Sequence, residues 1–140
     1  MKIGHSRSAA ATPAFALIAE GWNELVQDGL TPDLRGNSPV EWPNHVIYAA
    51  RDDGEIVGVL CYGFIDVISA VTVTLAYVEP TSRRQGVFRD MWAALQEKAK
   101  TLKAARIIAD IHVNNQIALL AFDHVGAIPV SLSHELIVEG

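Results

Sequence analysis

The spacing of apolar positions along the chain predicts three helices. Apolar side chains recur every three or four residues over 15–26, and Thr12 and Pro13 before them suit the N-cap and the first helical position. The same spacing recurs over 87–102 and, more briefly, over 115–124, and glycines stand where the first and third helices would end. The chain is therefore expected to carry three amphipathic helices, separated by segments without helical spacing.

Between these helices lie runs rich in valine, isoleucine and threonine, which are typical of strands. The expected strands are an edge strand at 2–6 and strands at 46–50, 55–62, 71–78, 106–113 and 128–138. Asp52-Asp53-Gly54 reads as a hairpin turn, and residues 30–44, with three prolines, read as a long loop. The order of the elements predicts one α+β domain over residues 1–140, built on a central sheet.

Composition and charge narrow the class of protein. Half of the 140 residues are hydrophobic and 19% are charged, which excludes a disordered chain. The longest apolar run is too short and too polar to cross a membrane, and the formal net charge of −5 argues against bulk nucleic-acid binding. Cys61 is the only cysteine and no His or Cys cluster has zinc spacing, so we expect a cytoplasmic protein without a disulfide or a metal site.

One segment carries charge where a helix does not favour it. Arg83 and Arg84 precede the expected start of the second helix at Gly86, and Arg89 lies one turn inside it. Cations at a helix N-terminus oppose the helix dipole, whereas the free N–H groups there favour an anion. These arginines are either solvated charges paired with neighbouring acidic side chains or ligands of a bound phosphate. The strand, loop, glycine and helix in sequence favour a phosphate or pyrophosphate site, although neither the Walker nor the dinucleotide motif is present.

Residues 78–88, VEPTSRRQGVF, resemble the acetyl-coenzyme A signature of the GNAT N-acetyltransferases, Val-x-Pro-x-x-(Arg/Gln)-x-x-Gly-x-(Gly/Ala). A second block, residues 110–127, is similar to that family's later motif, with Asn115, Ala118 and Gly126 in register. The resemblance covers about residues 46–138 and implies a mixed central sheet. That sheet would be mostly antiparallel, splayed between its fourth and fifth strands and flanked by helices.

The resemblance also implies which residues bind acetyl-coenzyme A or a related acyl-coenzyme A. Backbone groups of Ala76, Tyr77 and Val78 would pair with the pantetheine arm, and backbone N–H groups between Arg84 and Phe88 would hold the pyrophosphate. The full set expected at the cofactor is Ala76, Tyr77, Val78, Arg83, Arg84, Gln85, Gly86, Val87, Phe88, Arg89, Asn115 and Phe122.

Two residues depart from the family pattern. Phe88 stands where the family prefers glycine or alanine, and either narrows the approach to the phosphates or points into the core; its helical spacing with the apolar stripe favours the core. Phe122 stands at the position of a tyrosine that commonly protonates the departing thiolate, and phenylalanine has no proton to give. General acid catalysis contributes roughly 10²–10⁴ in rate, so a slower enzyme or a substitute donor is expected.

A base is needed because the acceptor amine must lose a proton. On the expected strand 106–113, Asp110 and His112 share one face, and Asp110 matches the position at which some family members carry a glutamate base. Asp110 is therefore the candidate base, acting through a water, unless it only satisfies nearby donors; His112 is the weaker candidate. Thr72 and Thr74 would order water or simply favour a strand. Tyr77 would supply the missing hydroxyl if it faced the cofactor.

These features predict an acetyl-coenzyme A-dependent N-acetyltransferase that acts by direct transfer in a ternary complex. The acceptor would be a small-molecule amine or a peptide or protein amine, recognised in part by residues 20–45, and the final strand allows a homodimer. Two alternatives remain at this point. One is a non-catalytic acyl-coenzyme A-binding module on the same scaffold, favoured by Phe122; the other is an interaction module that does not bind the cofactor, disfavoured by the arginines.

Overall fold

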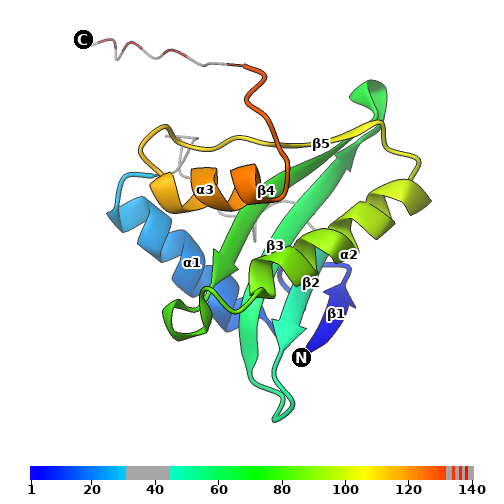
Figure 1. Ribbon diagram of the computed structural model, residues 1–140, viewed down its shortest axis with the longest axis vertical. Helices are drawn as coiled ribbons and strands as arrows, with labels where there is room; N and C mark the ends of the chain where they lie inside the picture. Colours follow the sequence, from blue (N-terminus) through cyan, green and yellow to red (C-terminus); the bar gives the residue numbers. More distant parts are fainter. Residues whose placement is uncertain (31–44, 132–133, 135, 137, 139–140) are drawn as a thin grey trace.

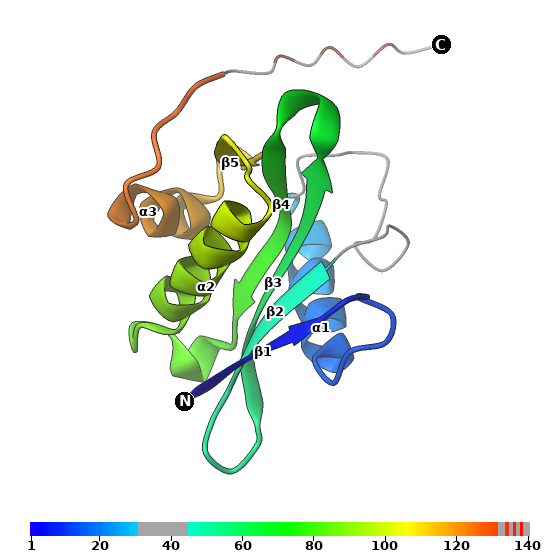
Figure 2. The same ribbon diagram turned by 90° about the vertical axis from the view of Figure 1, so that its right-hand side faces the viewer.

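A five-stranded sheet with helices on both faces forms the molecule (Figures 1 and 2). The computed structural model describes residues 1–30, 45–131, 134, 136 and 138. The strands are β1 (Lys2–Ser6), β2 (His45–Ala50), β3 (Ile56–Ile65), β4 (Ala70–Val78) and β5 (Arg106–Ala109); the helices are α1 (Phe15–Gln27), α2 (Val87–Thr101) and α3 (Gln116–His124). Short 3-10 turns, η2 (Asp66–Ile68) and η3 (Pro80–Ser82), flank β4. Figure 2 shows α1 on one face of the sheet and α2 and α3 on the other.

The strands lie in chain order, and the first four pair antiparallel. Only β5 is parallel to its neighbour, because the chain crosses the sheet through α2 between β4 and β5. The β4–β5 ladder is short and joins Ala70–Val73 to Arg106–Ala109. Beyond Val73 the two strands diverge, which confirms the mixed, mostly antiparallel sheet splayed between its fourth and fifth strands (Figure 1).

A β-bulge lies where β4 leaves β5. Opposite β3, Cys61 pairs with Leu75 and Tyr62 pairs with Val73, so Thr74 is the extra residue of the bulge. The bulge changes which side chains face which layer. Val73 belongs with the apolar side chains under α2, whereas Leu75 belongs with those under α1. The splay and the bulge therefore fall at the same point of β4.

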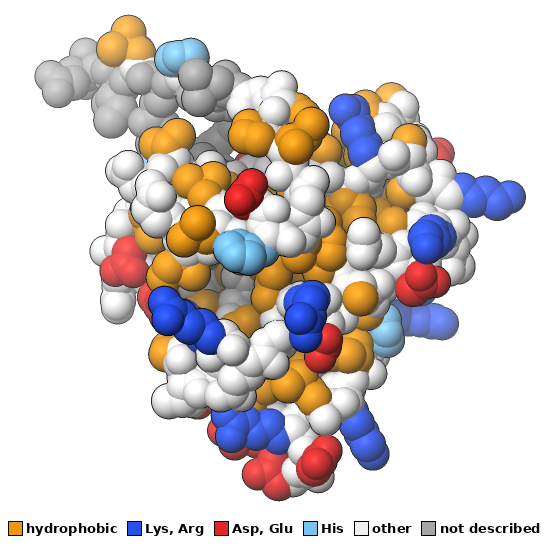
Figure 3. Space-filling view, in the orientation of Figure 1, with side chains coloured by type: hydrophobic (Ala, Val, Ile, Leu, Met, Phe, Trp, Pro, Cys, Tyr) orange, Lys and Arg blue, Asp and Glu red, His pale blue; other side chains and the backbone are white. Residues whose placement is uncertain are grey.

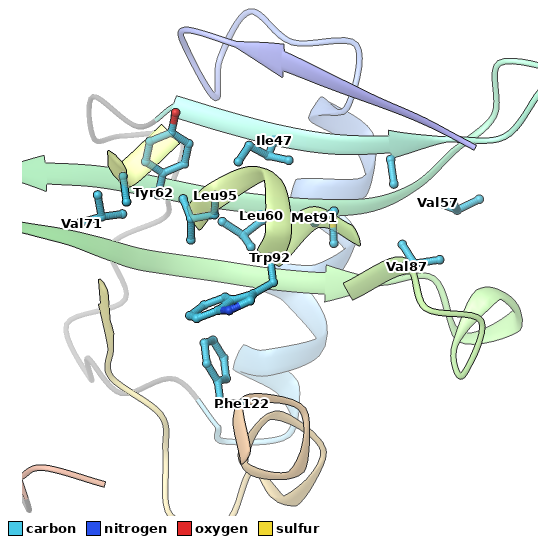
Figure 4. Packing of buried hydrophobic residues seen from close by; sticks show 12 residues of the cluster. Ile47, Val57, Leu60, Tyr62, Val71, Val87, Met91, Trp92, Leu95 and Phe122 are labelled. Atoms are coloured by element: carbon cyan, nitrogen blue, oxygen red, sulfur yellow. The ribbon is translucent and has the colours of Figure 1, made fainter. Parts of the chain in front are cut away.

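Two apolar clusters hold the layers together. The larger lies between the sheet and α2, and includes the fully buried Leu60, Met91 and Leu95 (Figure 4). The predicted stripe on α2 is confirmed, because its buried side chains are Val87, Met91, Trp92, Leu95 and Ala99. The smaller cluster lies between the sheet and α1, around Ile18 and Val59. Burial on both faces explains why the central strands read as nearly continuous apolar runs in the sequence.

Most of the expected elements are present, with differences at their ends. The edge strand β1, the hairpin at Asp52-Asp53-Gly54 and the helices α2 and α3 lie where they were predicted, and β3 continues three residues further, to Ile65. The expected loop at 30–44 lies outside the described residues, except for Leu30.

Two predictions about element ends are wrong, and a third predicted element is not found in the part of its segment that the structure describes. The first helix begins at Phe15 with Ala14 as N-cap, because Thr12 Oγ1 accepts from the Ala14 N–H (3.2 Å) and from the Ser6 hydroxyl (2.9 Å), which holds a turn before the helix. The fifth strand ends at Ala109 rather than at residue 113, because β4 has diverged from it by then. No strand forms among the described residues of 128–138, and the expected dimer through that segment stays a prediction.

Candidate functional site

The open edge of β4 is the centre of the candidate site. The Glu79 N–H donates to the Val57 carbonyl oxygen (2.9 Å), so the backbone groups of Val78 point away from β3, and strand alternation points those of Ala76 the same way. On that side β5 pairs only as far as Val73. The backbone between Ala76 and Val78 therefore presents N–H and C=O groups to the gap of the splay, as an added strand would require.

The loop between β4 and α2 has a backbone shape that suits an anion. Arg84 has φ +62° and Gly86 has φ +80°, so two left-handed residues flank Gln85. Where left-handed residues occur within a turn, successive backbone N–H groups point toward one concave side. Such a concave set of N–H groups can bind an anion. A left-handed arginine costs about 1–2 kcal/mol relative to a right-handed conformation. Strain of this kind is found where a loop has a binding role. The side chain of Gln85 is exposed and donates to the Thr81 carbonyl oxygen (3.4 Å).

The N-terminus of α2 opens onto this loop. Gly86 is its N-cap and no side chain caps the first turn, while the buried Val87 anchors the helix in the core. The guanidinium of Arg89 lies over Gly86, since a Cβ added there would come within 2.8 Å of Arg89 Nη2. Figure 3 shows the surface hollowed between α3 and the loop before α2, with basic side chains beside the hollow. Arg84 is exposed and the Arg89 side chain is 78% exposed, so both guanidinium groups are accessible to a ligand.

Arg83 points elsewhere. Its Nε donates to the Val78 carbonyl oxygen (2.9 Å), and its Nη2 lies 3.5 Å from Glu24 Oε1 on α1. The guanidinium carbon also lies 5.5 Å from the centre of the Tyr77 ring. The three arginines that the sequence brings together therefore divide: two lie exposed at the start of α2, and one is directed back to β4 and α1.

Tyr77 faces α1 and not the gap between β4 and β5. Its ring is buried, and its hydroxyl donates to Glu24 Oε2 (2.6 Å). Burial, and then the hydrogen bond to Glu24, raise the pKa of the Tyr77 hydroxyl far above its usual range. The condition under which Tyr77 would replace the missing acid hydroxyl is therefore not met, because its hydroxyl donates to a carboxylate on the other face of the sheet.

Three aromatic rings fill the space between α2 and α3. The Phe88 ring lies 6.1 Å from that of Trp92 and 5.3 Å from that of Phe122. The Trp92 and Phe122 rings meet edge to face at 5.4 Å (Figure 4). Phe88 packs against the core, as the spacing predicted. Phe122 is only 8% exposed, so the residue at the position of the family's acid serves as an apolar contact between the two helices.

The candidate base lies where the two strands separate. Asp110 follows the last paired residue of β5, Ala109, whose partner in the ladder is Val73. The Asp110 side chain is exposed, and no described residue binds its carboxylate. His112 Nδ1 accepts from the Asn114 N–H (3.1 Å), which assigns the proton of the neutral ring to Nε2. Asp110 and His112 lie beyond the strand, so the alternation that was expected to place them on one face does not apply.

Asn115 and the two threonines of β4 have structural partners. Asn115 is the N-cap of α3, and its Oδ1 accepts from the Ala118 N–H (3.1 Å). The hydroxyls of Thr72 and Thr74 donate to the Gly63 (3.5 Å) and Cys61 (3.2 Å) carbonyl oxygens of β3. Asn115 therefore sets where α3 begins, and the threonines support the β3–β4 ladder across the bulge.

Comparison with known proteins agrees with this arrangement. The family model for the acetyltransferase (GNAT) family matches residues 15–127, which span α1 to the end of α3. This chain belongs to the GNAT acetyltransferase family. No curated protein sequence matches it significantly.

Solved structures of GNAT acetyltransferases share the fold. A ribosomal-protein-alanine N-acetyltransferase from Brucella melitensis biovar Abortus 2308 superposes with a TM-score of 0.73 at 15% identity, over 99% of this chain and 100% of that one. An aminoglycoside acetyltransferase from an uncultured soil metagenomic sample gives 0.73 at 14% identity, over 99% and 96%. The aminoglycoside N-acetyltransferase AAC(6')-Iy in complex with coenzyme A gives 0.63 at 15% identity, over 99% and 100%. At these identities the likeness concerns the fold.

Two sets of contacts in this GNAT chain were not found from its sequence. Glu24 of α1 meets both Tyr77 and Arg83, and Arg51 of the β2–β3 hairpin donates to the Ser82 hydroxyl in the turn η3. The only available signal for the first was a pair of glutamates four residues apart on an otherwise apolar helix. The second carried no signal, because it joins two turns that are far apart in the chain.

No helix within the described ranges has the length and apolar character needed to span a bilayer.

Cys61 is expected to be inert in the native protein. Its side chain is 0% exposed, and burial raises the pKa of the thiol to about 12. At pH 8 only about one thiol in ten thousand is then ionised, and the thiolate is the reactive form. Ellman's reagent at pH 8 should leave the native chain unlabelled for hours and label it fully in urea. Rapid labelling without denaturant would show that the β3 core opens.

Proposed function

We propose that this chain is an acetyl-coenzyme A-dependent N-acetyltransferase that transfers the acetyl group directly to an amine in a ternary complex. The observation that carries the proposal is the open edge of β4 running into a left-handed loop and an uncapped helix N-terminus. An extended arm with amide groups fits the first part, and a pyrophosphate fits the second. Coenzyme A has both parts, and when bound it supplies an activated acetyl thioester.

The residues present fit that cofactor. The N–H and C=O of Ala76 and the N–H of Val78 would pair with the pantetheine amides, while the Val78 carbonyl is already bonded to Arg83. The backbone between Arg84 and Phe88 would hold the pyrophosphate, with the guanidinium groups of Arg84 and Arg89 beside it. Hydrogen bonds between charged groups are about twice as strong as neutral ones, so most of the affinity is expected from the phosphate end.

Asp110 is the proposed base. It lies at the point where β4 and β5 separate, so a thioester at the end of an arm along β4 would lie near it. Its carboxylate would accept the proton of the attacking amine through a water, while bound acetyl-coenzyme A would supply the acetyl group and take the bond electrons as its thiolate. The departing thiolate receives no proton from Phe122. Since a thiol has a pKa of about 8.5, a thiolate is a tolerable leaving group, and slow turnover is expected.

The acceptor is proposed to be a primary amine. Family members with this fold include enzymes named for ribosomal-protein alanine and for aminoglycosides, and both acceptors are amines. The formal net charge of −5 favours a cationic acceptor. Thiol release from acetyl-coenzyme A, measured with aminoglycosides and with peptides that begin with alanine, tests the proposal. Release above the amine-free background supports it, and absence of both coenzyme A binding and thiol release contradicts it.

A non-catalytic acyl-coenzyme A-binding module is the second candidate. It is favoured by Phe122, which places an apolar ring where the family's acid stands and buries it against Phe88 and Trp92. The two functions differ in one measurement. A chain that binds acetyl-coenzyme A by calorimetry but releases no thiol with any amine of the panel is such a module.

Replacing Asp110 with asparagine should slow turnover without weakening cofactor binding. The amide keeps the size of the side chain but has no basicity near neutral pH, and loss of general base catalysis costs roughly 10²–10⁴ in rate. We expect kcat to fall at least tenfold with an unchanged Kd for coenzyme A. Asp123→Asn, the same change on an exposed residue of α3, is the matched control. Equal rates for both variants would assign the proton transfer to bulk water or to another group.

A further inference from the structure

The guanidinium of Arg83 joins three parts of the molecule. It bonds to the backbone of β4 at Val78, it lies against the Tyr77 ring, and it meets the carboxylate of Glu24 on α1. The Arg83 side chain is 30% exposed, against 78% for that of Arg89. The bond to Val78 lies at the open edge of β4, whereas the contacts with Tyr77 and Glu24 lie on the side of α1.

Glu24 uses both of its oxygens in the same cluster. Oε2 accepts from the Tyr77 hydroxyl at 2.6 Å, and Oε1 lies 3.5 Å from Arg83 Nη2. Arg83, Tyr77 and Glu24 thus each contact the other two, and Glu20 Oε1 on α1 lies 3.5 Å from the Tyr77 hydroxyl as a second, longer acceptor. Burial and the carboxylates of Glu24 and Glu20 raise the pKa of Tyr77, so its hydroxyl stays a neutral donor beside the Arg83 cation and these two carboxylates.

This cluster fixes the start of the phosphate loop. Arg83 is the last residue before the left-handed Arg84, and its own backbone is extended, with φ −70° and ψ 157°. Anchoring its side chain to β4 and α1 therefore sets where the following N–H groups begin. The bond to the Val78 carbonyl also occupies one of the two lone pairs of the acceptor at the end of the open edge of β4.

We propose that Arg83 is a positioning residue: through Val78, Tyr77 and Glu24 it holds the phosphate loop against α1, and its guanidinium does not bind the phosphates. The inference rests on the proposed coenzyme A site and assigns a different task to one arginine of that site. Arg84 and Arg89 supply the charge at the pyrophosphate. Glu24, which touches no part of the cofactor, becomes necessary for cofactor affinity.

The two possible roles of Arg83 predict opposite results for Glu24→Gln. If Arg83 bound phosphate directly, Glu24 would compete with the ligand for the guanidinium, and removing its charge would tighten coenzyme A binding. If Arg83 is a positioning residue, the same change loosens the anchor and weakens binding. Asp28→Asn removes one negative charge from the next turn of the chain and corrects for the general effect of charge on an anionic ligand.

The experiment titrates coenzyme A into the wild-type chain, Arg83→Ala, Glu24→Gln, the double variant and Asp28→Asn by calorimetry. We expect Arg83→Ala and Glu24→Gln each to raise Kd about tenfold, as expected for a hydrogen bond between charged groups. The double variant should be no weaker than the weaker single, because both break one unit. The KM for acetyl-coenzyme A should rise by the same factor while kcat at saturation stays within about twofold.

A measurement without ligand tests the anchor itself. Amide hydrogen exchange over residues 79–86 should quicken in Arg83→Ala and in Glu24→Gln, and keep its wild-type rate in Asp28→Asn. A Kd for Glu24→Gln that is unchanged or lower than that of Asp28→Asn, beside a raised Kd for Arg83→Ala, would overturn the proposal and make Arg83 a phosphate ligand. Failure of the wild-type chain to bind coenzyme A would instead contradict the proposed function.

Discussion

Gly86→Val is expected to abolish coenzyme A binding in a chain that still folds. Gly86 has φ +80°, a conformation that a β-branched residue rarely adopts, and a Cβ there would also meet the Arg89 guanidinium at 2.8 Å. The backbone would leave the left-handed region, and the N–H groups at the start of α2 would no longer converge on one point. We expect at least about a hundredfold loss of affinity, since several charge-assisted hydrogen bonds are lost together.

The control for this variant is Gly29→Val. Gly29 also has a positive φ, +66°, and open space around it, so the substitution causes similar backbone strain at the end of α1. Calorimetry should show a normal Kd for coenzyme A, and the two variants should unfold at similar urea concentrations. Equal losses of affinity would mean that Gly86 acts through general stability and that the left-handed loop is not the phosphate site.

The largest loss of stability is expected from Leu60→Ala. Leu60 lies at the centre of β3, is 0% exposed and packs beneath α2 beside Met91 and Leu95 (Figure 4). Removing its methyl groups loses their burial and leaves a cavity, at a cost of about 2–5 kcal/mol. Urea unfolding followed by circular dichroism gives the difference in the free energy of unfolding. A domain of this size has only about 5–15 kcal/mol in total, so the expected loss is a large fraction of its stability.

Val67→Ala is the comparison for this measurement. Val67 lies in the turn η2 and is 95% exposed, so a similar apolar truncation there should change stability by less than about 0.5 kcal/mol. A similar loss for both variants would show that the cluster between the sheet and α2 is loosely packed. If Leu60→Ala left the free energy of unfolding unchanged, this cluster would likewise be shown to be loosely packed.

The sequence was sufficient to predict an element where its local apolar pattern agrees with its packing in the fold. The apolar stripe of α2 repeats over four turns and meets a single apolar face, so the helix could be located from spacing alone. The loop before α2 could be singled out for a related reason, because its arginines oppose the helix dipole and its glycine allows a close approach to an anion; phosphate binding there stays a prediction. Burial of Phe88 followed from its place on the same stripe.

The sequence was insufficient to predict a strand end or the direction of a side chain where contacts with distant segments determine it. The bulge at Thr74 leaves no mark in an alternating run of valine and threonine, yet it turns Tyr77 toward α1. β5 ends early because its neighbour diverges, and this depends on the bulge and not on residues 110–113. The direction of the Arg83 side chain depends on a glutamate in a helix that the sequence places far away.

The short parallel ladder has a consequence for how the molecule unfolds. β5 and α3 are joined to the rest by the pairing of Ala70–Val73 with Arg106–Ala109 and by the contact of Phe122 with Phe88 and Trp92. Such a unit can detach while β1 to β4 remain folded. A ligand between the diverging strands would bond to both sides and so resist this partial opening. Protease cleavage between Asp110 and Asn115 should therefore slow when coenzyme A is present. The measured affinity for coenzyme A would then include the free energy of docking β5 and α3 against β4.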